Sequence, residues 1–452
     1  MQEFMDEGYL ILRQVIPLDM LEPLRHSAEE VVYRRWPEGI SADTFQPMIH
    51  GLERYIDADT ANLVEFCLHE NILETTRQLM GGVEVAPSAI FMMYNPVRDF
   101  GPWWWHRDVS PLGTKGPLQG LQLDTLANGP MHLHWNIALY DDDVYWVVPR
   151  SHLRPNTEEE NRQLGAVPHS YAHGQLPQGE KRHEPLPGSV CADLKAGDAI
   201  VNHLELFHWG SNYGPKLRRT YHIGYRTFKG PRYFYEGFTR EIEFSKYLAA
   251  KSQALYERWV GMYEEECDTV EAVFRAIIER DKAGFLQGLA QLHPGESMRF
   301  VCLIHLCRIA QQMEQGSEGE FSPRFTADQI QTLWQGFGPL DEALKTEEEN
   351  YLPGLQIKGP SHYRLYDLPE NFGIDEFVDP IQIVRIEGVG LVDQDDRMCR
   401  ILAVHAAAGV GHQGWRLIER HHGEQRENHP QHQRDHAAPE PRASVTSATW
   451  HP

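Results

Sequence analysis

The sequence is poor in cysteine and contains no long apolar run. Six cysteines are scattered over 452 residues. A chain of this size does not need disulfides to stabilise its core, so we expect reduced thiols in a cytoplasmic protein. No apolar stretch approaches the roughly 20 residues of a transmembrane helix. The acidic N-terminus lacks a basic segment followed by a long apolar one, so we do not expect a signal peptide there.

Basic residues are also scarce relative to acidic ones. The chain has 42 lysines and arginines against 65 aspartates and glutamates, which gives a net charge of −23. Nucleic acids and anionic membrane surfaces attract basic proteins, so this balance argues against both as partners. The hydrophobic fraction of 41% is ordinary for a globular protein and allows a sizeable core. The length allows two or three domains.

The first half of the chain, residues 1–235, predicts a mainly β core preceded by helices. Residues 1–35 predict a short strand and a helix that starts near Pro17, and residues 60–80 predict a further helix. The remainder of this half alternates short β-rich runs with Gly, Pro, Asn and Asp clusters, a pattern typical of an antiparallel sandwich or small barrel. Two long polar loops are predicted within it, at residues 112–130 and 153–187.

The second half predicts helices and then a tail. Apolar residues recur at three- and four-residue spacing over residues 236–400, which predicts a mostly helical C-terminal region with Thr326 as the N-cap of one helix. The apolar run around Cys302 and Cys307 predicts a buried helix, in which cysteine acts as a small hydrophobic residue. Residues 401–452 are rich in histidine and lack apolar periodicity, which predicts a disordered tail.

A candidate site begins in the stretch WWWHRDVSP, residues 103–111. Alternate side chains of a β-strand point the same way, so His106 and Asp108 would face one point and Arg107 would turn away. One histidine and one carboxylate are two of the three ligands in the 2-His-1-carboxylate set of non-haem Fe(II) oxygenases. His208, at the end of a later β-rich run, is the candidate for the third. The alternative is an aromatic core strand that leads into a polar turn, with His208 a hydrogen-bonded histidine at a strand end.

Two arginines follow His208 where such an oxygenase would need one. Arg218, Arg219 and Thr220 open the next β-rich run. An iron oxygenase of this kind holds a dicarboxylate co-substrate, and the guanidinium fork of arginine binds a carboxylate through two parallel hydrogen bonds. Thr220 would share a strand face with Arg218. The combination of His-x-Asp, a distant His and Arg-x-Thr is far more specific than any one of its parts.

These motifs resemble those of the phytanoyl-CoA dioxygenase (PhyH-like) family of Fe(II)/2-oxoglutarate oxygenases. The resemblance covers residues 1–230 and rests on four stretches: FMDEGYLILRQVIPLDMLEPLR, WWWHRD, NIALYDDDVYWVVPRSH and FHWGSNYGPKLRRTYHIGYR. It implies a cupin-like double-stranded β-helix (jelly roll) in which His106, Asp108 and His208 bind Fe(II). It also implies 2-oxoglutarate and O2 as co-substrates, and hydroxylation of a small molecule with release of succinate and CO2.

The chain departs from the family pattern at two places. Arg150 stands where the family has the glycine of its VPGSH signature, and a turn that needs positive φ would be strained by arginine, so we expect that turn to differ. The connection from His208 to the arginine pair is one residue short. Counting back from the interior of the following strand favours Arg218 as the co-substrate ligand, as does the hydroxyl of Thr220. Counting forward from His208 favours Arg219; the two arginines lie on opposite strand faces, so only one can reach the site.

Further site residues follow from alternation in the run MHLHWNIALY, residues 131–140. His134 and Asn136 share one strand face. If that face lines the interior of the barrel, both side chains would contact the co-substrate or the substrate. The alternative is that this face is a polar side exposed to solvent.

The three tryptophans divide by the same rule. Trp104 would share the face of His106 and Asp108 and form a wall of the substrate site, while Trp103 and Trp105 would pack against the opposite layer. Indole faces attract cations, so a small substrate that is partly apolar or cationic is expected. Two weaker substrate candidates precede the metal loop: Tyr94 and Asn95.

Two rival interpretations stay open. A cupin-type metal site could use His132-x-His134, but positions 137 and 138 hold no glutamate. A catalytically silent binding or scaffold protein could have kept the jelly roll and used the helical half as an interaction module, although three separated ligands argue against it. Asp108 itself favours hydroxylation or desaturation over halogenation, because related halogenases replace the carboxylate by a small residue. The helical half could cover the barrel mouth, form a homo-oligomer or bind a partner.

We predict that Trp104→Ala impairs the coupling of 2-oxoglutarate turnover to substrate oxidation more than it impairs iron binding. Succinate, oxidised product and iron affinity, measured in parallel, check this expectation. The reverse result would mean that the strand is not regular at this point.

Overall fold

The structure is a computed structural model in which residues 1–391 form one compact unit and residues 392–452 a second. The second unit, and with it the predicted tail, lies outside the described residues. No helix in the described ranges combines the length and the apolar character that crossing a membrane requires. The described residues are 1–39, 48–94, 105–108, 110–111, 116–154, 156–160, 185–210, 217–228, 242–351 and 364–365.

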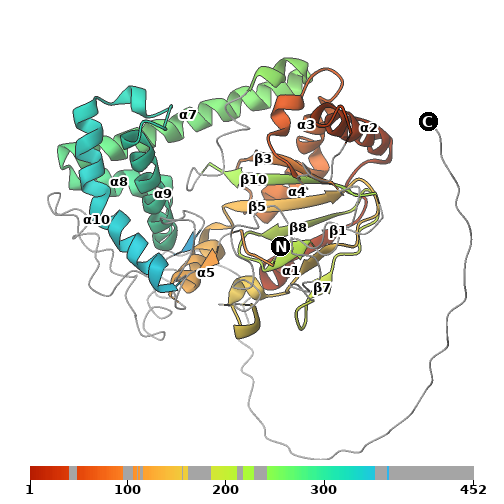
Figure 1. Cartoon of the computed structure of the whole chain (residues 1–452), viewed down its shortest axis with the longest axis horizontal. Coiled ribbons are helices and arrows are strands. Elements are labelled where there is room, and N and C mark those ends of the chain that lie inside the picture. The colour runs from red at the N-terminus through yellow and green to blue at the C-terminus, as the bar shows by residue number, and fades with distance from the viewer. Residues whose placement is uncertain are drawn as a thin grey trace, which may run out of the picture. The chain divides into compact units, whose positions relative to one another are not determined.

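Two antiparallel sheets form the core of the first half. The larger has the strand order β1-β8-β5-β10-β3-β2 and the smaller the order β7-β6-β9; β3, β10, β5, β8 and β1 lie side by side in Figure 1. Apart from the pairs β2–β3 and β6–β7, neighbours in space are not neighbours in sequence, as expected for a jelly roll. The predicted double-stranded β-helix is confirmed. The strands are β1 Tyr9–Leu12, β2 Met48–Ile49, β3 Val85–Tyr94, β5 His132–Ala138, β6 Tyr145–Val147, β7 Val190–Cys191, β8 Ala199–His203, β9 His208–Gly210 and β10 Arg219–Thr227.

Helices cover the outer face of the larger sheet. Pro17 is the N-cap of α2, as predicted. The helix predicted over residues 60–80 is two helices, because His69 interrupts it and its side chain accepts a hydrogen bond from the backbone of α4. Trp135 on β5 donates its indole N–H to Thr76 of α4 at 3.1 Å, so sheet and helices share one core. These helices are α1 Gln2–Glu7, α2 Leu18–Arg35, α3 Asn62–Cys67 and α4 Glu70–Leu79.

Side chains on β5 and β10 alternate between this outer core and the interior between the sheets. Ala138 packs against the smaller sheet, so His134 and Asn136, four and two residues earlier on the strand, face the same way. Thr220 pairs with Ala138, and His222 pairs with Asn136. The polar face of β5 therefore lines the interior rather than solvent. The outward set belongs to the outer core: Leu133, Trp135, Ile137, Tyr221, Ile223 and Tyr225.

The C-terminal part of the unit is helical, as predicted, and forms a second core. Cys302 and Cys307 are buried in α9, and Thr326 Oγ1 caps α10 by accepting from the Gln329 N–H at 3.3 Å. The cysteines in the described part of the chain form no disulfide with one another: Cys67, Cys191, Cys267, Cys302 and Cys307. The helices are α7 Ala250–Glu279, α8 Lys282–Leu292, α9 Glu296–Glu314 and α10 Ala327–Tyr351.

Helix α7 belongs to both cores. Its Trp259 packs into the core of the larger sheet, whereas its residues from Tyr263 onward pack into the helical core. Buried Arg226, on the inward-facing register of β10, forms an ion pair with Glu266 of α7. The short parallel pair of β4 Ser110–Pro111 with β11 Arg364–Leu365 joins a later part of the chain to the residues that follow Asp108. The predicted boundary at residue 235 stays a prediction.

Residues 112–130 are not the loop that the sequence predicts, since α5 occupies Gly116–Asn128. Gly116, Pro117 and Gly120 lower the helix propensity of α5, and for this reason a loop was predicted. Tertiary contacts stabilise the helix instead. Asp124 accepts a hydrogen bond from the backbone N–H of Met298, in the first turn of α9, at 2.9 Å, and Gln122 donates to the His152 carbonyl at 2.9 Å.

The turn at Arg150 keeps a left-handed conformation although it carries no glycine. Arg150 has φ 64° and ψ 5°, and its backbone N–H donates to the Glu7 carbonyl at 2.9 Å. The expected difference from the family's turn stays a prediction. Arg150 accepts the strain of a Cβ in the αL region, which costs roughly 1–2 kcal/mol for an L-residue.

Arg150→Gly is expected to raise the free energy of unfolding by about 0.5–1 kcal/mol, because relief of the αL strain exceeds the extra entropy that glycine gives the unfolded chain. Arg150→Ala is the matched control, since it removes the same side-chain length but keeps the Cβ. Denaturant unfolding of both variants checks this. Equal stability of the glycine and alanine variants would contradict the strain argument.

Candidate metal centre

Three side chains converge at one side of the interior between the sheets. His106, Asp108 and His208 each present a ligand atom, and these atoms lie within 4.8 Å of one another. The described residues contain no other group of three or more His, Cys, Asp or Glu side chains placed in this way to hold a metal ion. The side chains of His106 and Asp108 are 23% and 24% exposed, so the group is reachable from solvent on one side. Two imidazoles and a carboxylate on one side of a metal leave coordination positions open for other ligands.

Backbone pairing brings the two histidines together. His106 and His208 exchange two N–H to carbonyl hydrogen bonds of 2.9 Å each, an isolated antiparallel bridge outside the named strands. A regular strand was predicted for the segment WHRD, but the structure does not form one there. Only one bridge is formed, but His106 and Asp108 still face the same point. Arg107 turns to the other side, as predicted.

The protonation of His208 suits a metal ligand. Its Nδ1 lies 2.9 Å from the Leu206 carbonyl, an acceptor, so Nδ1 carries the proton and the lone pair of Nε2 remains available. Burial, together with the neighbouring His106, lowers the pKa of His208 to about 3, so the ring is neutral at physiological pH. Neutral imidazole is the form that binds a transition metal.

Asp108 is anionic and has its two oxygens in different surroundings. Burial would raise the pKa of its carboxyl, but His208, His134 and His106 hold that pKa well below its usual value. Oδ1 lies 3.7 Å from His106 Nε2, on the side of the metal ligands. Oδ2 lies 3.4 Å from His134 Nδ1, on the other side. The carboxylate can therefore offer one oxygen to a metal while the other faces His134.

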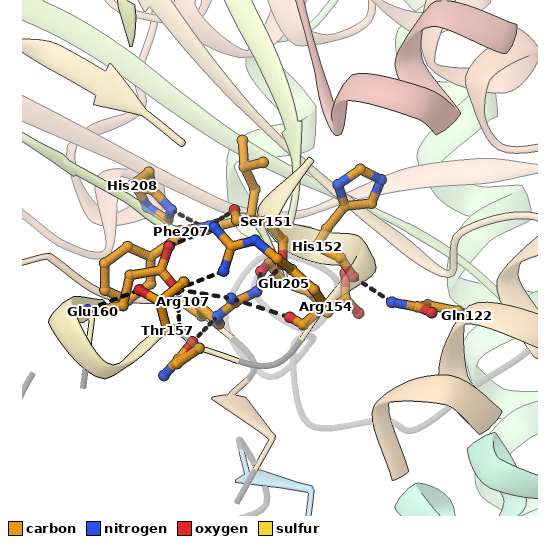
Figure 2. A network of polar contacts seen from close by, with 12 residues as sticks. Arg107, Gln122, Ser151, His152, Arg154, Thr157, Glu160, Glu205, Phe207 and His208 are labelled. Carbon is orange, nitrogen blue, oxygen red and sulfur yellow. Dashed lines mark hydrogen bonds and ion pairs between the residues drawn. The ribbon is translucent and has the colours of Figure 1, made fainter. Parts of the chain in front are cut away.

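Arg107, between the two ligands of the metal loop, is the centre of the polar network in Figure 2. Its guanidinium donates to Asn156 Oδ1 at 2.7 Å and to the carbonyls of Ser151, at 2.7 Å, and Glu205. Burial lowers its pKa to about 10, so the group stays protonated at neutral pH. It joins the metal loop to the turn after β6 and to the segment that leads into His208.

The register of β10 separates the two candidate arginines. Arg218 is buried and its Nε lies 3.2 Å from Asp142 Oδ1, on the interior side with Thr220. Arg219 points to the outer face, where it pairs with Glu29 of α2 at 2.8 Å. Only Arg218 is therefore on the side of the metal ligands.

Two interior side chains near Arg218 have buried polar atoms without a hydrogen-bond partner among the described residues. Both amide atoms of Asn136 and the hydroxyl of Thr220 are in this state, and both residues are fully buried. An unpaired buried polar group costs about 1–3 kcal/mol, so such a group usually marks a ligand or water position. This chemistry, a cation with hydroxyl and amide donors, fits a bound carboxylate.

The other predicted site residues divide into three groups. His134 lies on the interior face and contacts Asp108. Tyr94 does not: it pairs with Arg219 in the sheet register, and its hydroxyl accepts from the Trp36 indole at 2.6 Å within the outer core. Its assignment to the substrate is wrong, because alternation turns it outward. The predicted residues outside the described part of the chain are Asn95, Trp103 and Trp104.

Trp105 packs away from the ligands, as predicted. Its ring is fully buried and stacks on Phe207 and Trp209, with centroid separations of 5.5 and 4.9 Å. Both partners flank His208. The aromatic stack thus supports the bridge between His106 and His208 from the side opposite the metal ligands.

Two polar residues and one aromatic residue at the site were not predicted from the sequence. Asp142 supports Arg218, and His222 lies 3.2 Å from His134 through its Nδ1. Phe91 stacks on His222, with centroids 4.8 Å apart. The two-residue alternation that places Thr220 on the interior face of β10 also places His222 there, so the sequence could have predicted His222. Nothing in the acidic run around Asp142 distinguishes the residue that turns inward.

Comparisons with known proteins found one matching family model and several solved structures of partial likeness. The family model described as phytanoyl-CoA dioxygenase (PhyH) matches residues 4–220. No curated protein matches the chain. Among solved structures, AviO1 from Streptomyces viridochromogenes Tue57 has 20% identity and a TM-score of 0.34, over 50% of this chain and 92% of that one.

Two further solved structures show a similar degree of likeness. The non-heme alpha ketoglutarate dependent epimerase SnoN from nogalamycin biosynthesis has 16% identity and a TM-score of 0.34, over 50% of this chain and 82% of that one. EctD from S. alaskensis with bound Fe has 18% identity and a TM-score of 0.34, over 50% of this chain and 75% of that one.

We predict that Arg107→Lys lowers the free energy of unfolding by about 3 kcal/mol, because lysine cannot reproduce the fork of donors and leaves buried carbonyls unpaired. The apo-protein variant should also bind Co(II) more weakly, since the metal loop loses its anchor. Arg13→Lys is the control, because the Arg13 side chain is 57% exposed where it pairs with Asp198. Unchanged stability and unchanged Co(II) affinity in Arg107→Lys would show that Arg107 does not anchor the metal loop.

Proposed function

We propose that the protein is an Fe(II)/2-oxoglutarate-dependent oxygenase that hydroxylates a small molecule, since the phytanoyl-CoA dioxygenase family model matches residues 4–220. The observation that carries the proposal is the convergence of His106, Asp108 and His208 on the interior face that also holds Arg218. Facial ligand sets of this kind suit Fe(II) and leave positions for a bidentate co-substrate and O2.

His106, Asp108 and His208 would hold Fe(II) beside the barrel interior. When bound, iron and 2-oxoglutarate supply the oxidation chemistry: O2 is consumed, 2-oxoglutarate is converted to succinate and CO2, and a substrate C–H bond is oxidised. The ligand residues contribute geometry and charge. The neutral His106 and His208 and the anionic Asp108 offset one of the two positive charges of Fe(II).

Arg218 would bind the distal carboxylate of 2-oxoglutarate. Its guanidinium is buried, and Asp142 fixes it through Nε, so the fork is pre-oriented for a carboxylate. Thr220 and Asn136 would donate hydrogen bonds from the adjacent positions of β10 and β5. Their unpaired atoms would thereby gain partners, and the closely packed interior would exclude competing water from the co-substrate.

The nature of the oxidation follows in part from Asp108. A carboxylate at this position occupies the place that halide would need, so hydroxylation or desaturation is favoured over halogenation. The substrate is a small molecule in this proposal. A silent scaffold is the alternative function, but it would have no need for buried, unpaired donors beside three intact ligands.

The direct test is succinate formation from 2-oxoglutarate by Fe(II)-loaded protein under air. We expect slow turnover without substrate, which His106→Ala and Asp108→Ala reduce at least about a hundredfold through loss of the metal. Addition of metabolite fractions should stimulate it where they contain the substrate. Turnover that survives both alanine substitutions would overturn the ligand assignment.

The adjacent arginines provide a matched pair for the co-substrate. Arg218→Lys is expected to raise KM for 2-oxoglutarate tenfold or more, about 1.4 kcal/mol, because a lysine cannot make two parallel hydrogen bonds. Arg219→Lys, on the outer face, should leave KM unchanged. Steady-state kinetics of the two variants decide the assignment, and the opposite ranking would transfer the role to Arg219.

A further inference from the structure

A chain of polar contacts leads from Asp108 into the barrel interior. His134 Nδ1 lies 3.4 Å from Asp108 Oδ2, and His134 Nε2 lies 3.2 Å from His222 Nδ1. The first pair is within ion-pair distance but is not aligned as a hydrogen bond, because Asp108 Oδ2 has no hydrogen-bond partner among the described residues. Such contacts often tighten only when the site is loaded, and His134 is the side chain placed to donate to this oxygen.

The direction of the hydrogen bonds along this chain follows from their chemistry. An ionised carboxylate only accepts, so His134 can donate to Asp108 only with its proton on Nδ1. In a neutral ring Nε2 is then an acceptor, and His222 must donate to it from its own Nδ1. Burial lowers the pKa of His222 well below its usual value, which is consistent with a ring that carries a single proton. Both rings are thereby held as the same tautomer.

Packing holds the two rings in place. Phe91 stacks on His222 with centroids 4.8 Å apart and lies 5.4 Å from the centroid of His134. Both histidines lie on central strands of the larger sheet. His134 on β5 is paired with residues of β8 and β10, and His222 on β10 is paired with Asn136 of β5. A group oriented by sheet and by aromatic contacts can in turn orient a carboxylate, as buried partners of metal ligands commonly do.

We propose that His134 is a positioning residue that fixes the carboxylate of Asp108 for monodentate metal binding, and that His222 fixes the tautomer of His134. The inference rests on the proposed function, because Asp108 must be a metal ligand. His134 then acts through Asp108 rather than as a contact of the co-substrate. Without its donor, the carboxylate can rotate, and the second oxygen competes for the coordination position that the reaction needs.

Two substitutions of His134 separate the effect of its N–H donor from the effect of its side-chain size. Asparagine places an N–H donor near the position of Nδ1, whereas glutamine places it near the position of Nε2, farther from Asp108. We expect His134→Gln to weaken Co(II) binding by the apo-protein about 10–100-fold and to alter the Co(II) ligand-field spectrum. His134→Asn should retain affinity within about threefold, since it keeps the donor.

His132 supplies the control. It lies two residues earlier on the same face of β5, is buried, and has its Nε2 2.8 Å from Ser88 Oγ, away from Asp108. His132→Gln is expected to bind Co(II) like the wild type. Equal Co(II) affinity and equal spectra for wild type and His134→Gln, while His106→Ala abolishes binding, would overturn the inference alone. Absence of Co(II) binding by the wild type would overturn the proposed function as well.

A measurement on the wild-type protein covers the case in which a variant fails to fold. Imidazole ¹⁵N chemical shifts, with Zn(II) as a diamagnetic metal, report the tautomer of each histidine. We expect the proton on Nδ1 in both His134 and His222. A proton on Nε2 of His134 would leave the carboxylate of Asp108 facing a lone pair, and this result would contradict the proposal irrespective of any substitution.

Discussion

The metal centre depends on one reciprocal pair of backbone hydrogen bonds, between His106 and His208. Each N–H reaches the carbonyl of the other residue at 2.9 Å, and no longer ladder extends from this bridge in the described residues. An isolated bridge contributes little by itself, because the net value of one hydrogen bond is only about 1 kcal/mol. Arg107 on one side and the stack of Trp105 with its aromatic neighbours on the other provide the missing rigidity. The metal loop is thus held by a buried cation and by ring packing rather than by a sheet.

Asp108 and Arg218, the charged groups proposed to bind the metal and the co-substrate, are oriented in the same way. Asp108 and Arg218 both face the interior, and each contacts a side chain that holds it at one atom: His134 at Oδ2 of the aspartate and Asp142 at Nε of the arginine. A buried charge is costly unless it is paired. A partner that engages one atom offsets part of that cost and also defines the direction in which the rest of the group points.

Alternation explains what the sequence could and could not predict. A period of two assigns faces within a strand, so the polar side of β5 and the ligand pair His106 and Asp108 were predictable. It cannot choose between adjacent residues without a register, and for this reason Arg218 and Arg219 stayed open until the pairing of β10 with β3 and β5 was known. The same lack of register misplaced Tyr94. Helix α5 escaped prediction because contacts with α9, distant in sequence, override the weak propensity of its own residues.

The unpaired atoms of the interior give the strongest physical reason to regard the barrel as a working site. Asn136, Thr220 and His222 each hold a buried polar atom without a partner among the described residues, at a cost of roughly 1–3 kcal/mol each. Apolar residues of similar size could remove that cost, and a protein that used the jelly roll only as a scaffold would gain stability from them. The cost persists together with the ligand triad and with Arg218 on the same face. A ligand that accepts hydrogen bonds from Thr220 and Asn136 would remove part of this cost and so gain binding energy. A dicarboxylate would therefore supply the hydrogen-bond partners that the interior lacks.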